Sequence, residues 1–508
     1  MKYKIFLLTF LSAFLFTSTD IGARPIKIQT SQPRILDYRW IQVNDMNMIL
    51  SNNGIFGQTS EGNAGFYWPS GYPNETYIYG GGIWIGGRYR NDSNPSTYDT
   101  FVTCGYNPAS AGGTEFVPGL PPNDDPSNPD EKIYLSSDTD WPLQNSIGED
   151  SVLSILDSYC TYNDYDTSQH FVSENLPLDI SIIQQTYAFT GGLRDNILFF
   201  TVNIILDTSK DTLHDAFVSI CTDCDIGNES GASGNDLVKF DKEYNMAYQW
   251  QNDPESGWTH SPGTIAFKFL QGPPSNGIDT VHYYKDPYDT TKTDSIVIHP
   301  SDTLGMTVFK IFTIDIDPVN KFERYQEMSG YTYKNLDPQN PEDSYNPYDI
   351  DVYGPSDKRF IMSAGPFNLI PGDTTKIAFA VLMATDTNTI YATADKAQDI
   401  YNSGMQSVKE KTTHKFVEYF IRSLGNDLFT EKIDLEYNII NDGNVNISIY
   451  DACGRFVTRL VDSYAKSGSH RISWRGVDSR GNKVRNGIYF ISMNHNGSVK
   501  STKVMLIK

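Results

Sequence analysis

The end of the chain, Asn444 to Lys508, constrains the fold most, because short alternating runs follow one another between turn residues. Val445, Ile447 and Ile449 alternate with polar neighbours, which is the period of a half-buried strand. His470 to Trp474 repeats the alternation, and glycines or Asn-Gly pairs separate the runs about every ten residues. Glycine tolerates the positive φ that such turns need. The pattern predicts a small antiparallel β-sandwich.

The same residues carry a family resemblance. The region 431–508 resembles the Ig-like module of flagellar hook-capping proteins (FlgD) and the type A C-terminal sorting domain of type IX (Por) secretion cargo. Several separate motifs match in order along the chain. The residues that carry the match are Gly454, Arg455, Gly468, His470, Trp474, Gly476, Asp478, Gly481, Asn486, Gly487 and Tyr489.

The resemblance implies a destination and a partner. Sorting domains of this kind are recognised by the type IX secretion machinery at the outer membrane. The resemblance therefore implies a protein that is secreted, or held on the outer-membrane surface, of a Gram-negative bacterium. An Ig-like cap with no sorting role is the alternative.

The start of the chain has the features of a secretory signal. Lys2 and Lys4 precede the apolar run Ile5 to Phe16, and small residues before position 24 offer a cleavage site. The run is too short for a good membrane span, so no transmembrane segment is expected after cleavage. Residues 1–23 are predicted to be the signal peptide and 24–34 an exposed lead-in.

The charge of the chain excludes some partners. With 62 acidic and 40 basic residues the formal net charge is −22, which argues against nucleic acid and anionic lipid as ligands. The 32 tyrosines and 27 phenylalanines indicate a folded, β-rich chain. Five cysteines are too few and odd in number for a disulfide scaffold.

The sequence therefore predicts a mainly β, multi-domain protein. Residues 35–404 are expected to form a β-sandwich body, with two subdomains divided near residue 190 as an open alternative. Apolar residues at helical spacing predict one packed helix near 388–404. The Tyr-, Asp- and Pro-rich stretch 321–353 is expected to be irregular. Residues 405–430 are predicted to be a linker, with a short helix over 416–424 as one reading, and 431–508 the Ig-like domain.

One stretch of the body is rich in oxygen ligands. Calcium takes six to eight oxygens from closely spaced carboxylates and carbonyls. The segment from Cys221 onward begins like a calcium loop, but the third acidic ligand and the terminal Glu are missing at the expected spacing. Solvated turn carboxylates are the alternative to a calcium site. The candidate ligands are Asp223, Asp225, Asn235, Asp236 and Asp241.

A glycine-rich segment, 77–87, is a candidate for a different kind of site. It lacks the spacing of a nucleotide loop and no helix pattern follows it, so it is predicted to be a strand whose glycines admit close backbone approach. Aromatic residues around it are either core or a platform for a sugar ring. They are Tyr67, Trp68, Tyr77, Tyr79 and Trp84.

The body contains no nucleophile, zinc or phosphate-loop motif. The first hypothesis is accordingly a secreted or surface protein whose body acts in binding, adhesion or surface structure, with an extracellular glycan or surface-layer component as partner. The alternative is an extracellular polysaccharide-active enzyme, similar to a glycoside hydrolase, with the same export tag. Such enzymes need only two carboxylates at a set separation, which a sequence cannot reveal.

Overall fold

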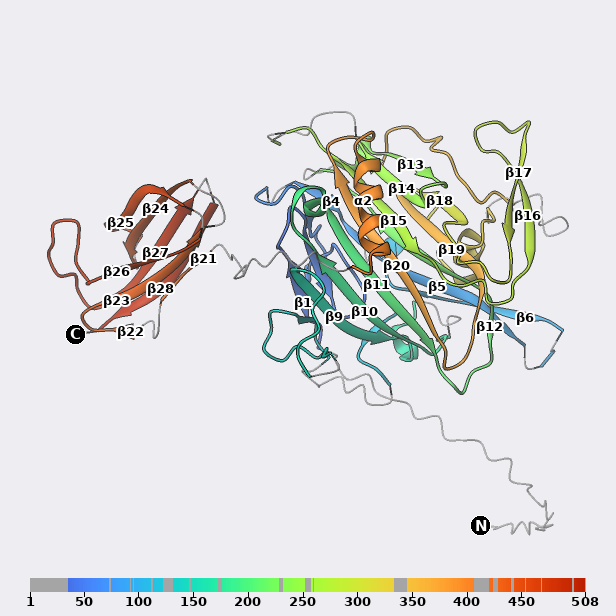
Figure 1. Cartoon of the computed structure of the whole chain (residues 1–508), viewed down its shortest axis with the longest axis horizontal. Coiled ribbons are helices and arrows are strands. Elements are labelled where there is room, and N and C mark those ends of the chain that lie inside the picture. The colour runs from blue at the N-terminus through green and yellow to red at the C-terminus, as the bar shows by residue number, and fades with distance from the viewer. Residues whose placement is uncertain are drawn as a thin grey trace, which may run out of the picture.

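The structure is a computed structural model of the 508-residue chain. It describes residues 35–507 except 73–74, 92, 95, 111–112, 122–130, 146–147, 172–175, 228–231, 252–256, 259, 333–344, 406–419, 424–427, 440–442, 453, 467 and 496–497. The predicted signal peptide, lead-in and much of the predicted linker lie outside these residues. The described residues form two β-rich units, a body and a C-terminal domain (Figure 1), so the mainly β fold predicted from the sequence is confirmed.

The largest sheet of the body has nine strands. Its order is β13-β14-β15-β20-β11-β10-β9-β7, with β8 also paired to β9. The strands are β7 (Val117–Pro118), β8 (Tyr134–Leu135), β9 (Leu156–Asn163), β10 (Ile180–Ala188), β11 (Ile197–Leu206), β13 (Leu237–Asp241), β14 (Met246–Trp250), β15 (Thr264–Gln271) and β20 (Thr374–Ala384).

Two smaller sheets supply the rest of the sandwich. A five-stranded sheet has the order β18-β19-β12-β5-β6, and a four-stranded sheet has the order β1-β2-β3-β4. The strands are β1 (Tyr38–Ile41), β2 (Asn47–Ser51), β3 (Phe66–Tyr67), β4 (Thr76–Ile78), β5 (Gly80–Arg90), β6 (Tyr98–Cys104), β12 (Leu213–Asp223), β18 (Val308–Phe312) and β19 (Arg359–Leu369).

The main core fills the space between these sheets. Alternate residues of β10, β11 and β20 share one apolar cluster with alternate residues of β5, β12 and β19. At its centre the rings of Phe200 and Phe379 stack at a centroid distance of 4.7 Å, and Phe56 lies 5.5 Å from Phe200. Burial of such rings is the main stabilising contribution in a sandwich of this kind.

The nine-stranded sheet continues without a break across residue 190. β10 and β11, on either side of it, pair antiparallel from Ile180↔Leu206 to Ala188↔Leu198. The two strands form a hairpin, and their pairing leaves no place for a subdomain boundary at this position.

Two helices cover the outer faces of the sandwich. α2 (Ile390–Asn402) is the helix expected near 388–404, and its buried face packs on the nine-stranded sheet through Ile390, Ala394 and Ala397 (Figure 1). α1 (Lys321–Met328) was missed, because eight residues are too few to show a helical period within a Tyr- and Asp-rich stretch. Asn320 caps α1 by accepting a hydrogen bond from the Glu323 N–H.

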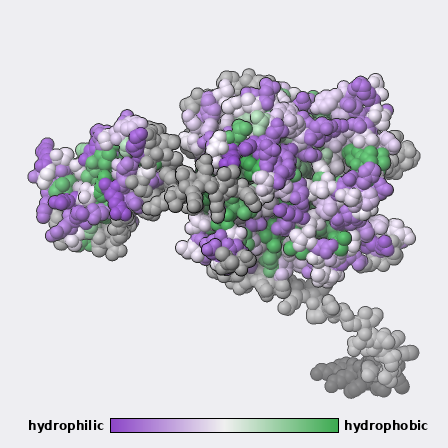
Figure 2. Space-filling model, in the orientation of Figure 1, coloured by the Kyte–Doolittle hydropathy of each residue, from purple (hydrophilic) through white to green (hydrophobic). Residues whose placement is uncertain are grey.

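A hairpin, β16 (Thr280–Lys285) and β17 (Thr293–Ile298), is a separate two-stranded sheet of the body. Val281 pairs directly with Val297, and both side chains are about half exposed. Figure 2 shows apolar surface in the region where Figure 1 draws this hairpin.

The four described cysteines of the body are buried free thiols. The Cys221 side chain lies in the apolar cluster on the outer face of the five-stranded sheet, whereas the Cys224 side chain belongs to the main core. Burial raises the pKa of both thiols well above the ordinary value, which is the behaviour of structural rather than reactive cysteines.

The C-terminal domain is a sandwich of a three-stranded sheet, β21-β23-β26, and a five-stranded sheet, β22-β28-β27-β24-β25. Its first strand pairs with β23 and its second with β28, so Phe420–Ser423 and Leu428–Phe429 belong to the domain and not to a linker or a helix. The strands are β21 (Phe420–Ser423), β22 (Leu428–Phe429), β23 (Ile433–Ile439), β24 (Gly443–Asp451), β25 (Phe456–Ala465), β26 (Gly468–Trp474), β27 (Gly487–His495) and β28 (Ser498–Leu506).

The glycines of β5 generate a prediction about stability. A Cβ atom on Gly82 would lie 2.6 Å from the carbonyl carbon of Gly105, which is backbone and cannot swing aside. We expect Gly82→Ala to destabilise the body by about 1–3 kcal/mol, measured as a lower unfolding midpoint in urea. Gly234→Ala is the control, since a Cβ there meets open space. Equal midpoints for the two variants would contradict the close approach.

Candidate functional site

Strand pairing brings a third carboxylate, Asp357, to two that are close in the sequence, Asp223 and Asp225. β12 pairs antiparallel with β19, and this register sets Asp223 opposite Arg359. Asp225 follows the end of β12 by two residues and Asp357 precedes β19 by two, so both fall on the same side as this pair. One ligand atom from each of Asp223, Asp225 and Asp357 lies within 4.8 Å of the others.

Asp223 is buried, Asp225 and Asp357 are half-buried, and the hydrogen-bonding capacity of all three is only partly satisfied. Asp223 accepts hydrogen bonds on Oδ2 from Arg359 Nε and the Tyr106 hydroxyl, each at 3.1 Å. The Oδ1 atoms of Asp223, Asp225 and Asp357 are shielded from solvent and have no hydrogen-bond partner. A fourth carboxylate, Asp317, lies 3.5 Å from Arg359 Nη1 and also has an unpartnered Oδ1. We call Asp223, Asp225, Asp317 and Asp357 the acidic cluster.

Burial and mutual repulsion disfavour the charged forms of this cluster. Burial raises the pKa of Asp225 to about 7, with further contributions from Asp223 and Asp357. Burial likewise raises the pKa of Asp223 and of Asp317 to about 6, although Arg359 opposes the rise in both. The single guanidinium of Arg359 does not offset four carboxylates.

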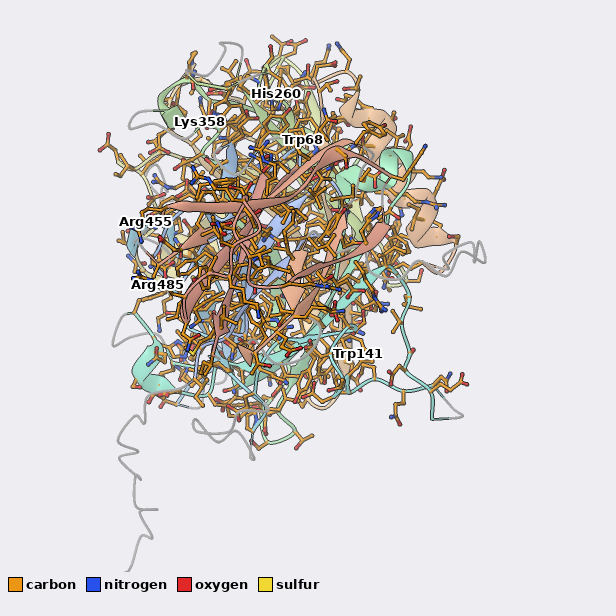
Figure 3. All side chains as sticks on the ribbon, turned by 90° about the vertical axis from the view of Figure 1, so that its left-hand side faces the viewer. Trp68, Trp141, His260, Lys358, Arg455 and Arg485 are labelled. Atoms are coloured by element: carbon orange, nitrogen blue, oxygen red, sulfur yellow. The ribbon has the colours of Figure 1, made fainter. Side chains whose placement is uncertain are left out.

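Lys358 does not serve the acidic cluster. It is fully buried, its ammonium lies 3.1 Å from Asp351, and it donates to the carbonyl oxygens of Asp236 and Gly354 (Figure 3 labels Lys358). Because side chains alternate along the backbone at this point, Lys358 and Arg359 serve different partners.

The other predicted calcium ligands separate into two groups. Asp236 accepts from the Gln249 amide at 2.7 Å and interacts electrostatically with Asp225, and burial raises its pKa well above the usual range. Asn235 Oδ1 and Asp236 Oδ1 are buried without a partner. Asp241 is engaged elsewhere: it caps the β13–β14 turn and accepts from the Tyr391 hydroxyl. The sequence missed Asp357, because only the β12–β19 register brings it near Asp223.

Most of the aromatic residues around the glycine-rich strand are core, which is one of the two alternatives that the sequence left open. Tyr77 and Trp84 are 0% exposed and Trp68 is 6% exposed, so these rings are core. Tyr67 is half-buried and stacks on Trp40 at 5.6 Å, and Tyr79 is also half-buried. Figure 3 labels Trp68 and His260, whose rings lie 6.3 Å apart in one aromatic group with Trp258. The glycines of β5 make room for two other rings, since a Cβ on Gly80 would meet Tyr106 and a Cβ on Gly81 would meet Phe56.

An open pocket of about 500 Å³ lies elsewhere on the body. Neutral polar side chains dominate its wall, with one tyrosine and two apolar side chains among them. Gln58 is almost fully buried and its amide nitrogen has no hydrogen-bond partner. The lining residues are Tyr38, Asn53, Ile55, Gln58, Thr59, Ser60, Gly62, Gly113, Thr114, Ser168, Gln169, His170 and Phe171.

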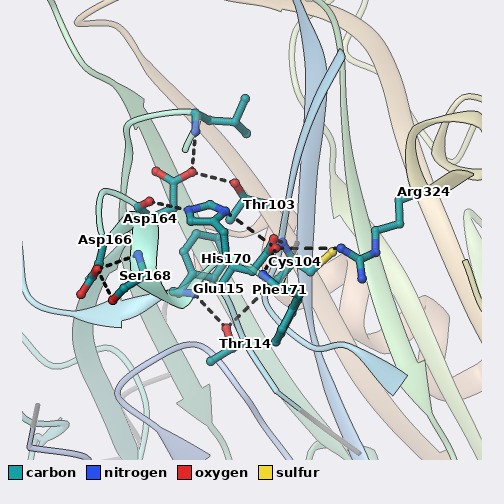
Figure 4. Close-up of polar contacts among 12 residues, drawn as sticks. Thr103, Cys104, Thr114, Glu115, Asp164, Asp166, Ser168, His170, Phe171 and Arg324 are labelled. Carbon is teal, nitrogen blue, oxygen red and sulfur yellow. Dashed lines mark hydrogen bonds and ion pairs between the residues drawn. The ribbon is translucent and has the colours of Figure 1, made fainter. Parts of the chain in front are cut away.

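A buried polar network borders this pocket (Figure 4). Glu115 is fully buried and accepts from the Cys104 and Phe171 backbone N–H groups at 2.8 and 3.1 Å. His170 Nε2 contacts the Asp164 carbonyl at 2.9 Å, while Nδ1 lies 3.7 Å from Glu115. Arg324, from α1, lies 3.9 Å from Glu115. The side chain of His170 is only 1% exposed, and its contact with the Asp164 carbonyl links two loop segments next to the pocket.

Several motif residues of the C-terminal domain make contacts within that domain. Trp474 is buried, donates from Nε1 to the Val477 carbonyl at 2.9 Å and packs 5.0 Å from Tyr489. His470 stacks on Tyr437, and Arg455 pairs with Asp451. Asp478 accepts backbone hydrogen bonds within its turn. Glycines at left-handed φ occupy positions 454, 468, 476 and 481.

Comparison with known proteins agrees with the Ig-like fold of the C-terminal domain. Residues 430–498 match the FlgD Ig-like domain family. FlgD from P. aeruginosa is 21% identical over 18% of this chain and 67% of its own, with a TM-score of 0.13. The search of curated proteins gives no match.

Two other solved structures align with longer parts of the chain. A polysaccharide lyase is 9% identical over 93% of this chain and 46% of its own, with a TM-score of 0.24. PorZ, a surface component of the type IX secretion system of Porphyromonas gingivalis, is 10% identical over 66% and 38%, with a TM-score of 0.14. At these TM-scores neither structure assigns an activity to the body.

Among the described residues, no helix combines the length and apolarity needed to cross a membrane.

The network next to the pocket predicts a pH dependence. Asp164 is fully buried and accepts from Thr103, Leu178 and Ile180, and burial still raises its pKa to about 6. A carboxyl whose folded pKa exceeds its unfolded value of about 3.9 is costly once ionised, so this cost grows as the pH rises from 4 to 6 and stays constant above. Asp164→Asn should flatten the pH profile of unfolding free energy between pH 4 and 7, by up to about 3 kcal/mol. An unchanged profile would show that Asp164 ionises without cost.

The buried indole of the C-terminal domain generates a second prediction. Trp474→Ala removes the largest buried side chain of this unit, and such a truncation costs about 3–5 kcal/mol. Hydrogen–deuterium exchange of the full chain should then show lost protection in residues 433–506 and unchanged protection in β10 and β11. Protection lost equally in both units would mean that they do not unfold separately.

Proposed function

We propose that the protein is exported across the outer membrane by its C-terminal Ig-like domain and acts outside the cell through its β-rich body. The observation that carries the proposal is the C-terminal domain itself, a sandwich with its own core that matches the FlgD Ig-like family. The apolar N-terminal run supports the same route, since a signal peptide would deliver the chain to the periplasm.

The separate cores of the two units support a division of labour. Among the described residues, the C-terminal core draws on residues from Ile421 to Leu506, and the main body core on residues from Ile41 to Met383. A module that folds from its own residues can be recognised in the same form whatever it is attached to. In this account the type IX secretion machinery is the partner of the C-terminal domain.

Removing the C-terminal domain tests the export role. A chain lacking residues 420–508 should accumulate in the periplasm of a type IX-competent host, while the full chain reaches the surface or the medium. Cell fractionation and immunoblotting measure the distribution. Because the body retains its own core, the truncated chain should stay folded and protease-resistant. Export of the truncated chain at the full-length level would contradict the proposal.

The body is proposed to bind an extracellular glycan in the pocket next to Gln58. The pocket wall includes hydroxyl and amide side chains, no Asp, Glu, Lys or Arg among the described residues that line it, and one tyrosine. Such a wall suits a neutral, hydroxyl-rich ligand. His170 is committed to the loops around it, which favours binding over catalysis at this place.

A filled-pocket variant tests this binding role. Ser60 lines the pocket, so Ser60→Trp should reduce retention on polysaccharide affinity gels at least tenfold, because the indole occupies the ligand's space. Ser209→Trp, at an exposed position outside the pocket wall, is the matched control. Release of new reducing ends from the same polysaccharides would favour the alternative, a polysaccharide-active enzyme. Equal retention of the two variants on the gels would contradict glycan binding in this pocket.

A further inference from the structure

We infer that the acidic cluster at the end of β12 and the start of β19 binds a calcium ion. The inference is independent of export and of the glycan pocket, and it assigns ligands that the sequence alone did not bring together. The proposed direct ligands are Asp223, Asp225 and Asp357, which each have a carboxylate oxygen within 4.8 Å of the others.

Unpartnered buried oxygens point to a ligand at this place. Asp223 is 3% exposed, and its Oδ1 has no hydrogen-bond partner, as is also true of Oδ1 of Asp225 and Asp357. A buried carboxylate oxygen without a partner is costly, and proteins normally satisfy it with a donor, a water or a cation. Three carboxylates that each bring an oxygen to one small volume, and that each have an unpartnered buried oxygen, favour a cation, because a single donor would satisfy only one of them.

The charge balance favours a divalent ion. When ionised, the four carboxylates of the acidic cluster carry −4, and Arg359 contributes +1, so the local sum is 1 − 4 = −3. Lys358 does not change this sum, since its ammonium is committed to Asp351 and two backbone carbonyls. A bound divalent cation brings the sum to −1 and gives Asp223, Asp225 and Asp357 a shared positive partner, which favours their ionised forms.

The chemistry of the ligands favours calcium. All the converging atoms are oxygens, which suit hard cations rather than zinc. Two more unpartnered oxygens, Asn235 Oδ1 and Asp236 Oδ1, belong to the same loop region. The side chain of Asp357 is 38% exposed, so the cluster opens to solvent on one side and leaves room for water ligands. Calcium accepts such an irregular set more readily than magnesium does.

The ion would join segments from distant parts of the chain. Asp225 begins the connection from β12 to β13, whereas Asp357 ends the connection that leads into β19. The ion would therefore link these two connections at the same rim of the sandwich. Arg359 is the cation that contacts three carboxylates there. The proposed ion would therefore have a structural role and stabilise the folded body.

Terbium and calcium titrations of the full secreted chain test the inference. Tyr106 donates to Asp223 at 3.1 Å, so a bound Tb³⁺ should show luminescence sensitised by tyrosine. We expect one ion per chain, displacement of Tb³⁺ by Ca²⁺ but not by equimolar Mg²⁺, and a calcium-dependent rise in melting temperature that a chelator reverses.

Single substitutions distinguish ligands from bystanders. Asp225→Asn and Asp357→Asn should weaken calcium binding at least tenfold, whereas Asp241→Asn, which removes an equal charge from a residue engaged elsewhere, should bind like the parent chain. In chelator, Asp225→Asn should melt at or above the parent's temperature, because it removes a buried charge that has no partner. Calcium binding that is absent in the parent, or unchanged in both ligand variants, would overturn the inference. Export and glycan retention are measured separately, so their failure would leave this result standing.

Discussion

The body depends on one interface, the apolar contact between its nine-stranded sheet and the smaller sheets that cover it. Phe200 and Phe379 from neighbouring strands stack there, and Phe56 fills the space above them. A Cβ atom on Gly81 would lie 2.4 Å from the Phe56 ring, so glycine at this position lets the ring reach the core. Each buried ring contributes about 1.5–3 kcal/mol, and the glycines of β5 are the condition for that burial.

The same sheet geometry places the polar features at the rim. Antiparallel pairing of β12 with β19 puts Asp223 beside Arg359, and the next residues of the same parity, Asp225 and Asp357, follow beyond the strand ends. Charges at this rim are partly buried because the surrounding loops cover them. A second buried ion pair lies elsewhere in the body. Arg324 of α1 lies 3.9 Å from Glu115, and this pair links α1 to the segment between β6 and β7.

Periodicity and turn chemistry predicted much of the architecture. The C-terminal sandwich, the β10–β11 hairpin and the helix α2 follow from alternating or helical spacing within short segments. The failures have physical causes. α1 is too short to show a period, and the start of the C-terminal domain was placed late because β21 and β22 are strands of four and two residues. Tyr77 and Trp84 looked like a platform because a sequence shows aromatic character but not which face of a strand is covered.

The candidate site shows the same limit more sharply. Asp223 and Asp225 are two residues apart, so the sequence could pair them, whereas Asp357 joins them only through the strand register. Asp241 was included because it is close in sequence, but its hydrogen bonds lie with its own turn and with Tyr391. Sites built across paired strands need the fold before they can be recognised.

The central claim is that the C-terminal domain is a self-sufficient export unit and the body is what it delivers. The most direct measurement fuses residues 406–508 to a folded fluorescent protein with a cleavable signal peptide and follows its location in a type IX-competent host. The account predicts that the passenger reaches the cell surface or the medium and that the same fusion carrying Trp474→Ala stays in the periplasm. A passenger that remains periplasmic with the intact, folded domain would contradict the account.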